Sequence, residues 1–141
     1  MKLAGVVRQE VALSIGLVPS QTIELDRFCI HPDFHKRNFA SFLLGRLGRL
    51  VKADIPGVCT LVSFADSDQG HSGSIYKAAN WKLAGVSRPG YLYRKPDGGI
   101  VHKKTAWNAA KVRGMSEKEY ADFAGLTKES TGPKSKFIFS L

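Results

Sequence analysis

The pattern of apolar and polar positions predicts a strand, a polar loop and an amphipathic helix between residues 24 and 51. Residues 24–30 (ELDRFCI) have the composition of a buried strand, and Pro32 ends it because proline cannot donate to a β-ladder. From residue 39 onward apolar side chains recur at helical spacing. The apolar positions are Phe39, Leu43, Leu47 and Leu50, widened by Leu44 and Val51, and the opposite face holds Ser41, Gly45, Gly48, Arg49 and Lys52.

Shorter apolar runs on either side of this segment predict further strands. Residues 3–18 fit one or two strands around a polar turn at residues 8–10, with VALSIGLV as the second run. Residues 58–65 (VCTLVSFA) are almost continuously apolar, which is typical of a strand buried on both faces. With a helix between them, the strands at 24–30 and 58–65 should pair in parallel, so the loops that follow each strand should meet at one edge of the sheet.

The second half of the chain alternates short helices and strands. Residues 72–79 predict a helix capped by Ser72, with Ile75, Ala78 and Ala79 buried and Asn80 as a left-handed cap. The Lys95–Gly99 turn predicts a hairpin between residues 91–93 and 100–102. Two more helices follow, ended by Gly114 and Gly125, the second opened by the capping box of Ser116 and Glu119. A strand at 136–141 ends the chain.

Length and charge narrow the range of functions. The 141 residues fit one domain, and 43% hydrophobic content is ordinary for a globular protein. The net charge of +9 is not ordinary, and it indicates a polyanionic partner such as nucleic acid, an anionic cofactor, or both; a basic surface that only aids solubility is the alternative. Cys29 and Cys59 have no zinc-like spacing and fit buried free thiols in a reducing cytoplasm. No signal peptide or membrane span is visible, so we expect no membrane partner.

The start of the predicted helix at residue 39 has the properties of an anion site. Asn38 suits the N-cap, and no Glu or Gln stands at the third helical position to close a capping box. Backbone N–H groups there are left free, the positive end of the helix dipole is exposed, and Lys36 and Arg37 lie beside it. We therefore expect a phosphate or pyrophosphate here. His31, Asp33 and His35 superficially suggest a metal cluster, but Pro32 breaks their alternation and a phosphate loop explains them more simply, so no metal is predicted.

This loop and the segment after the next strand carry a resemblance to a known family. The stretch HPDFHKRNFASFLL resembles the pyrophosphate loop of the GNAT superfamily of acyltransferases, with His35 in place of the usual Arg or Gln and Asn38 in place of Gly. Together with LVSFADSDQGHSGSIYKAANW, it resembles the phage Mom group of that superfamily, whose members modify the exocyclic amine of adenine in DNA. The N-terminal part is shorter than is usual for the superfamily, whose members form one wall of the acceptor site there.

The resemblance implies a set of site residues and a cofactor. The fold would be α/β, with a GNAT-like mixed, mostly antiparallel central sheet and helices on both faces. The cofactor would be acetyl-CoA or a related acyl-CoA. Its binding residues would be Ile30, His35, Lys36, Arg37, Asn38, Phe39, Ala40 and Ser41.

Two residues of the second motif are the predicted catalytic groups. The resemblance matches Tyr76 to the tyrosine that protonates the departing thiolate, and a phenol within hydrogen-bond reach is a suitable general acid. A half-buried core tyrosine is the alternative. Asp66, at the carboxyl end of the strand, would orient or deprotonate the attacking amine, or else it is a turn aspartate that bonds the backbone two residues on. His71 fits a loop residue as well as a substrate contact.

Residues 103–125 combine several cations with one tryptophan, Trp107, on segments of helical character. The two helices around Gly114 predict either a helix-turn-helix reader or an αα-hairpin that covers one face of a sheet. We treat them as a basic helical hairpin appended to a single GNAT-like domain of residues 1–141. The predicted nucleic-acid contacts are Lys103, Lys104, Lys111 and Arg113.

Together these features indicate binding of an acyl-CoA-like cofactor. The resemblance implies that the enzyme would modify adenine in phage DNA, in the host cytoplasm, and would protect that DNA from restriction. Two alternatives remain open: an N-acetyltransferase acting on a protein, RNA or small amine, and a non-catalytic basic nucleic-acid-binding module. The first shares the cofactor loop but predicts no strongly salt-dependent affinity for DNA.

Overall fold

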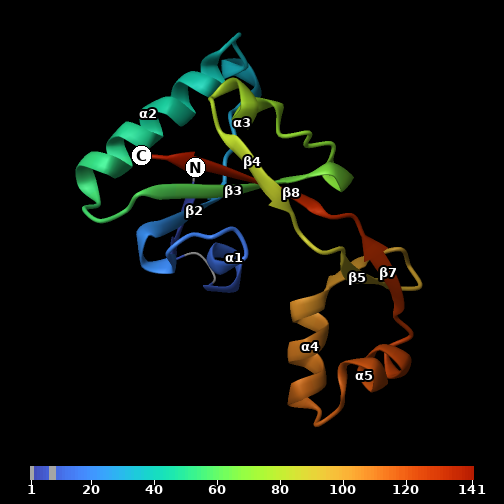
Figure 1. Cartoon of the computed structure of the whole chain (residues 1–141). Coiled ribbons are helices and arrows are strands. Elements are labelled where there is room, and N and C mark those ends of the chain that lie inside the picture. The colour runs from blue at the N-terminus through green and yellow to red at the C-terminus, as the bar shows by residue number, and fades with distance from the viewer. Residues whose placement is uncertain (1, 7–8) are drawn as a thin grey trace. The chain divides into compact units, whose positions relative to one another are not determined.

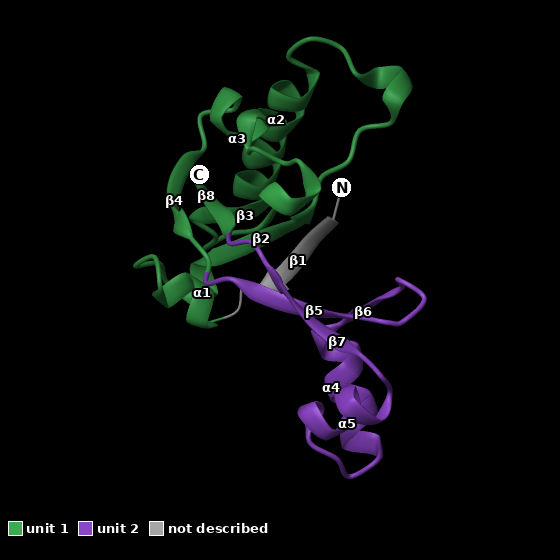
Figure 2. Cartoon of the chain, turned by 90° about the vertical axis from the view of Figure 1, so that its right-hand side faces the viewer, with its two compact units in different colours: residues 1–87, 134–141 green, residues 88–133 purple. Residues whose placement is uncertain are grey.

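The computed structural model describes residues 2–6 and 9–141, with side chains from residue 9 onward. The chain divides into two compact units, unit 1 from residues 1–87 and 134–141 and unit 2 from residues 88–133 (Figure 2). Each unit is described by itself below. The single domain expected for residues 1–141 stays a prediction. None of the helices in the described residues is long and apolar enough to cross a membrane.

Unit 1 is built on a mixed five-stranded sheet in the order β1-β2-β3-β8-β4 (Figure 1). β2 and β3 run parallel, with Thr22 opposite Thr60, and the remaining neighbours are antiparallel. The expected α/β class with a mixed, mostly antiparallel sheet is confirmed. The strands are β1 (Lys2–Val6), β2 (Thr22–Arg27), β3 (Thr60–Asp66), β4 (Lys82–Val86) and β8 (Lys134–Ser140).

Helices cover both faces of this sheet, because β3 sends alternate apolar side chains to opposite sides. Leu61 and Ala65 join the core formed with α2 (Phe39–Asp54) and α3 (Ser74–Ala78). Val62 is fully buried on the other face, where Ala12 of α1 (Gln9–Leu13) packs against it. The almost continuous apolar run of this segment is therefore that of a strand buried on both faces, as predicted.

The N-terminal apolar run forms a helix where a strand was predicted. Residues 9–13 form α1, and the 3-10 turn η1 (Pro19–Gln21) leads into β2. Short apolar runs fit a helix or a strand equally well, and here the run covers one face of the sheet, with Ala12 packed against Val62. The part of the predicted turn at residue 8 lies outside the described residues.

The buried face of α2 is rotated from the predicted one. Leu44, Leu47 and Val51 are buried as expected, but Leu50 is 51% exposed. Gly48, placed on the polar face by its spacing, is buried instead. A Cβ at Gly48 would meet the ring of Phe139 at 2.7 Å, so glycine is what lets α2 approach β8 this closely.

Helix α3 is shorter than predicted and buries other side chains. Its N-cap is Gly73 rather than Ser72, and Tyr76 and Ala79 are buried while Ile75 is 36% exposed. Asn80 adopts the predicted left-handed conformation, with φ of 62°.

Unit 2 holds a three-stranded antiparallel sheet in the order β6-β5-β7, packed with two helices. The hairpin between β5 (Gly90–Arg94) and β6 (Ile100–His102) and the capping box of Ser116 and Glu119 are confirmed. The predicted helices are α4 (Lys103–Val112) and α5 (Glu117–Phe123). β7 (Thr127–Thr131) was not predicted; most of its side chains are exposed, so it carries no apolar signal.

Candidate functional site

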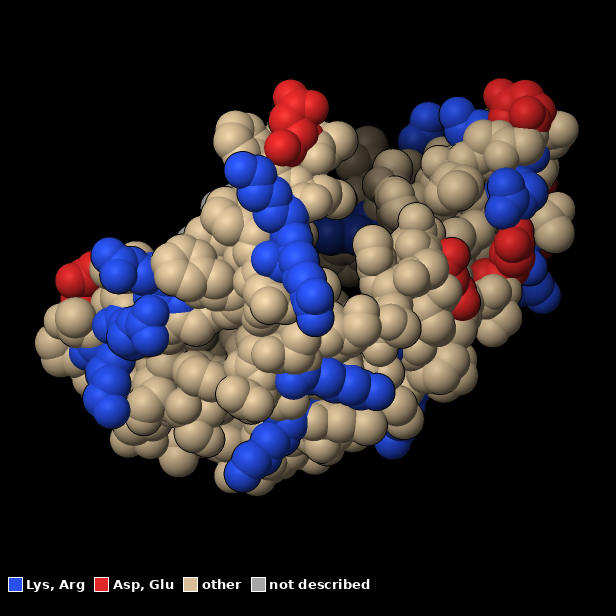
Figure 3. All heavy atoms as spheres, turned by 90° about the horizontal axis from the view of Figure 1, so that it is seen from above, with Lys and Arg blue, Asp and Glu red and all other residues tan. Residues whose placement is uncertain are grey.

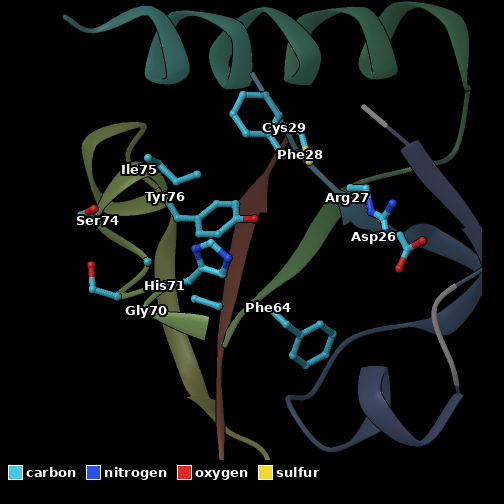
Figure 4. A pocket seen from close by; sticks show the side chains of 13 residues that line it. Asp26, Arg27, Phe28, Cys29, Phe64, Gly70, His71, Ser74, Ile75 and Tyr76 are labelled. Atoms are coloured by element: carbon cyan, nitrogen blue, oxygen red, sulfur yellow. The ribbon is translucent and has the colours of Figure 1, made fainter. Parts of the chain in front are cut away.

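Two adjoining hollows lie in unit 1 where the loops after the parallel strands β2 and β3 come together. The first, of about 600 Å³, borders the start of α2, and the second, of about 330 Å³, borders Tyr76 and the loop before α3 (Figure 4). Four residues line both: Phe28, Cys29, His71 and Ile75. The predicted meeting of the two loops at one edge of the sheet is therefore observed.

The loop that borders the first hollow is shaped by bonds within its own chain segment. After β2 ends, the short 3-10 helix η2 (Pro32–Phe34) turns the chain, and the His35 Nε2–H donates to the Ile30 carbonyl at 3.0 Å. The Lys36 N–H donates to the Phe34 carbonyl at 2.8 Å. Asn38 then takes a left-handed conformation, with φ of 62°, which asparagine tolerates better than most residues.

Helix α2 begins with backbone donors that face no partner. The Asn38 side chain makes no capping bond, so its predicted role as a side-chain cap is not observed. The Phe39 N–H donates to Lys36, but among the described residues no acceptor meets the N–H of Ala40 or Ser41. The Ser41 hydroxyl donates to the Asn38 carbonyl at 2.9 Å. The N-terminus of this sixteen-residue helix therefore has backbone N–H groups available to an anion.

Most of the predicted cofactor-binding residues lie around the first hollow. Its lining includes Ile30, His35, Lys36, Arg37 and Ala40. The other three (Asn38, Phe39 and Ser41) belong to the same loop and first helical turn but are not among the lining residues.

Tyr76 reaches from α3 toward β3, where its hydroxyl lies 2.7 Å from the Ser63 hydroxyl. The Ser63 O–H donates to the Leu25 carbonyl at 2.9 Å, and since serine has one hydroxyl proton, Tyr76 is the donor to Ser63. Tyr76 is 7% exposed, and burial raises the pKa of its hydroxyl. The Ser63 hydroxyl can turn to donate to the ionised phenolate, which offsets part of this effect. The phenol therefore keeps its proton at neutral pH.

The ring of Tyr76 is fixed by two aromatic neighbours. It stacks on Phe137 with 5.2 Å between ring centroids and lies at the same distance from Trp81. Gly73 allows this close packing, because a Cβ there would meet the Phe137 ring at 2.3 Å, and its φ of 74° is itself unfavourable for other residues. Tyr76 thus combines the predicted site position with the packing of a core residue.

Asp66 lies at the end of β3 with its carboxylate held on both oxygens. Lys134 Nζ contacts one oxygen at 2.8 Å, and the Asp68 N–H donates to the other at 3.1 Å, which opens the 3-10 turn η3 (Ser67–Gln69). The hydrogen bond from Lys134 is the main reason that the pKa of Asp66 lies below its ordinary value. Asp66 is not among the residues that line either hollow. Its geometry includes the turn bond considered as the alternative, and its catalytic role stays a prediction.

Sequence reasoning missed Phe28, which follows β2 directly, whereas Arg27 was considered as a polar group either near the cleft or at an edge of the sheet. Arg27 and Phe28 line the second hollow because β2 ends at Arg27, three residues earlier than predicted, and the chain then turns across the sheet edge. Cys29 was predicted to be a buried thiol, but it is exposed and borders both hollows, and Cys59 is exposed too. The sequence allowed two interpretations of His71, a substrate contact or an ordinary loop residue. In the structure His71 lines both hollows.

The residues considered as metal ligands lie at the surface. His31 Nδ1 is 3.4 Å from an Asp33 carboxylate oxygen, and both side chains are largely exposed. Within residues 2–6 and 9–141, no three His, Cys, Asp or Glu side chains form a group that could hold a metal ion.

Cations are spread widely over the surface, with Lys and Arg more frequent than Asp and Glu on the face shown in Figure 3. In unit 2 the four predicted nucleic-acid contacts differ in their surroundings. Lys103 Nζ lies 4.7 Å from the centroid of the Tyr91 ring, and Arg113 packs over Tyr120 and donates to the Ala109 carbonyl at 3.2 Å. Lys104 is exposed, and Lys111 lies over the exposed Trp107 ring at 5.2 Å.

Comparison with known proteins places the chain in a family. A model of the Mom protein family matches residues 4–139, almost the whole chain. The chain belongs to the Mom protein family. The match spans both units, so the family signal includes the basic helices of unit 2 as well as the hollows of unit 1. No curated protein matches the chain.

Proposed function

We propose that this Mom-family chain is an acyl-CoA-dependent, GNAT-like transferase that modifies the exocyclic amine of adenine in DNA and so protects phage DNA from restriction. The observation that carries the proposal is the open start of α2, bordered by a hollow that adjoins the hollow of Tyr76. Membership in the Mom family supports DNA as the substrate.

The first hollow fits the diphosphate end of an acyl-CoA. The free N–H groups of Ala40 and Ser41 point along the helix dipole, and Lys36 and Arg37 add two positive charges beside them. The apolar side of the hollow, with Phe28, Phe34 and Ile75, suits the less polar remainder of such a molecule. When bound, the group supplies an activated acyl carbon and a thiol leaving group.

Tyr76 provides the proton that a leaving thiolate requires. The pKa of its hydroxyl is raised by burial, so the phenol is protonated at working pH and can donate. Ser63 accepts the hydrogen bond from Tyr76 in the resting state and fixes the direction of the hydroxyl. A small turn of the Tyr76 O–H toward the second hollow would redirect this proton.

Asp66 and His71 divide the work on the attacking amine. The exocyclic amine of adenine is a poor nucleophile, so it needs both positioning and removal of a proton. A lowered pKa makes the Asp66 carboxylate a weak base, and we give it an orienting role for the loop that carries His71, whose N–H donates to the Asp66 carbonyl at 3.0 Å. His71, which lines both hollows, is then the group placed to accept the proton.

A duplex must release its base to reach this site. Tyr76 is 7% exposed, so an adenine within a stacked duplex cannot approach it, and the target nucleotide would be flipped into the second hollow. The net charge of +9 favours the phosphate backbone that must lie over the opening.

The proposal is tested by isothermal titration of acetyl-CoA into the whole chain. Lys36→Gln and Arg37→Gln should each weaken binding by about tenfold to a hundredfold, as expected for loss of one charge-assisted hydrogen bond. Arg49→Gln, an exposed cation on α2 away from the hollow, is the matched control and should leave the affinity unchanged. An absence of acetyl-CoA binding by the wild type contradicts the proposal and favours a non-catalytic nucleic-acid-binding module.

A further inference from the structure

One face of α4 in unit 2 is exposed and has no role in packing. The helix buries Ala106 and Ala110 against the unit, which leaves the opposite side outward. The exposed residues at i, i+3, i+4 and i+7 spacing on that side define the α4 face: Lys104, Trp107, Asn108 and Lys111.

The chemistry of the α4 face fits a polyanion that also offers planar or apolar groups. Trp107 is 48% exposed, with Lys111 Nζ 5.2 Å from its ring centroid, so a cation and a large aromatic surface are presented together. Asn108 adds an amide with a donor and an acceptor side by side. Lys104 places a second positive charge one turn before Trp107 and Asn108. No Asp or Glu occurs anywhere in α4.

The second helix of the pair is unsuited to the same partner. In a helix-turn-helix reader the second helix enters the groove, but α5 carries three acidic residues in seven, Glu117, Glu119 and Asp122. Repulsion between these carboxylates and phosphates would oppose such docking. The alternative of a conventional helix-turn-helix mode is therefore disfavoured, and α4 is the element that can approach phosphates.

Contacts within unit 2 hold α4 and α5 on the sheet. Glu117 accepts hydrogen bonds from the hydroxyls of Tyr91 and Tyr93 at 2.7 and 2.9 Å, which ties the start of α5 to β5. Lys103 and Lys128 both place their ammonium groups over the Tyr91 ring, at 4.7 and 3.9 Å. Two of the cations that sequence assigned to nucleic acid, Lys103 and Arg113, thus contact tyrosine rings of unit 2, while Lys104 and Lys111 belong to the α4 face.

We propose that the α4 face is a docking surface for the major groove of duplex DNA, separate in residues from the hollows of unit 1. This rests on the proposed function only for the choice of DNA as partner. A ten-residue helix is about 15 Å long and 10–12 Å wide with side chains, which matches the roughly 12 Å width of the groove. Lys104 and Lys111 contact phosphates on either side, and Asn108 faces base edges, where its amide matches the N6 and N7 of adenine.

The first test uses fluorescence anisotropy of a labelled adenine-containing duplex with the full chain over a KCl series. Lys104→Gln and Lys111→Gln should each weaken binding and reduce the slope of log affinity against log salt by about one. Asn108→Ala should reduce the preference for adenine-containing over adenine-free sites on the order of tenfold, with little change in the salt slope. Lys118→Gln, an exposed lysine on α5, is the control and should leave both quantities unchanged.

The second test reads the surface directly. The chain has two tryptophans, of which Trp81 is 3% exposed and Trp107 is 48% exposed, so acrylamide quenching reports mainly on Trp107. Saturating duplex should reduce this quenching in the wild type, and single-stranded DNA or RNA of the same sequence should bind less tightly.

The outcomes separate this inference from the proposed function. Three results would overturn the α4 surface. The first is unchanged quenching of Trp107 in a saturated duplex complex, and the second is a loss of duplex affinity in Lys118→Gln equal to that in the α4 variants. The third is tighter binding of single strands or RNA than of duplex. Acetyl-CoA titration of the α4 variants should match the wild type, which shows that the variants are folded. Weaker acetyl-CoA binding in Lys36→Gln, with duplex affinity and Trp107 protection unaltered, is the result expected if the two sites are independent.

Discussion

The hydroxyl groups of Ser63 and Tyr76 lie 2.7 Å apart in the interior of unit 1, with Ser63 bonded in turn to the Leu25 carbonyl. This chain of two hydrogen bonds links all three elements that border the second hollow: β2, β3 and α3. It satisfies the hydroxyl groups of two buried residues, Ser63 at 1% exposure and Tyr76 at 7%, and it sets the direction in which Tyr76 holds its proton.

Replacing Ser63 should destabilise unit 1 and alter Tyr76 together. Ser63→Ala leaves the buried Tyr76 hydroxyl without its acceptor, which costs about 1–3 kcal/mol of unfolding free energy. When Tyr76 is ionised, the Ser63 hydroxyl can turn and donate to the phenolate, which lowers the pKa of Tyr76, so the loss of Ser63 should raise that pKa further. Urea denaturation and ultraviolet titration of the tyrosines measure the two effects. Ser140→Ala, at an exposed position of β8, should change neither; equal stability of Ser63→Ala and wild type would contradict the hydrogen-bond network.

Gly73 and Gly70 form a matched pair that separates backbone strain from close packing. Both have φ near +74°, but a Cβ at Gly70 meets nothing within 4 Å, whereas one at Gly73 meets the Phe137 ring at 2.3 Å. Gly70→Ala should therefore cost about 1–2 kcal/mol from the left-handed conformation alone. Gly73→Ala should cost more, by about 1–3 kcal/mol, because Phe137 and Tyr76 must shift. Thermal unfolding of the two variants provides the comparison, and equal losses would mean that α3 does not pack as described.

Asp66 should make the stability of unit 1 depend on pH in the acid range. Its pKa is lowered in the folded state, chiefly by Lys134, so its contribution is fully present above the unfolded value near 3.8 and is lost as pH falls through the lowered value. Asp66→Asn should be less stable than wild type at neutral pH, and the difference should shrink in acid. A constant difference at all pH values would contradict the ion pair.

The proposed division between His71 and Asp66 predicts different kinetic losses. His71→Asn should lower turnover by about 10²–10⁴-fold, the usual range for loss of a general base, while leaving acetyl-CoA affinity close to that of the wild type. Asp66→Asn should lower turnover less and should be partly recovered by conditions that stabilise the fold, such as added osmolyte. A larger loss in Asp66→Asn than in His71→Asn, at equal folded fraction by circular dichroism, would reverse the assignment.

Local signals in the sequence predicted much of the fold. Three local patterns were each sufficient to predict an element, because the structure that each specifies depends on neighbouring residues only. They are the apolar run of β3, the turn between β5 and β6 and the capping box of Ser116. The open start of α2 was predicted for the same reason, since a helix start and its flanking residues are contiguous, and its role as an anion site stays a prediction.

Features set by distant partners could not be predicted in this way. β7 is defined by pairing with β5 some 35 residues earlier, as in the register of Arg94 with Thr127 and Tyr93 with Lys128, and its own residues are mostly polar. The exposure of Cys29 depends on where β2 ends, and that is set by the pairing of β2 with its neighbouring strands. The engagement of Lys103 by Tyr91, which distinguishes it from Lys104, likewise depends on how α4 packs on the sheet of unit 2.

Nucleoside analysis of DNA tests the account most directly. DNA from cells that express the wild-type chain is digested to nucleosides and analysed by mass spectrometry, beside DNA from cells that express Tyr76→Phe at the same level. The account predicts a heavier deoxyadenosine derivative in DNA from cells with the wild type and none in DNA from cells with Tyr76→Phe. The variant lacks the phenol that is proposed to supply the proton, but its hollow at α2 is intact. Unmodified deoxyadenosine in both, or the same derivative in equal amount from Tyr76→Phe, would contradict it.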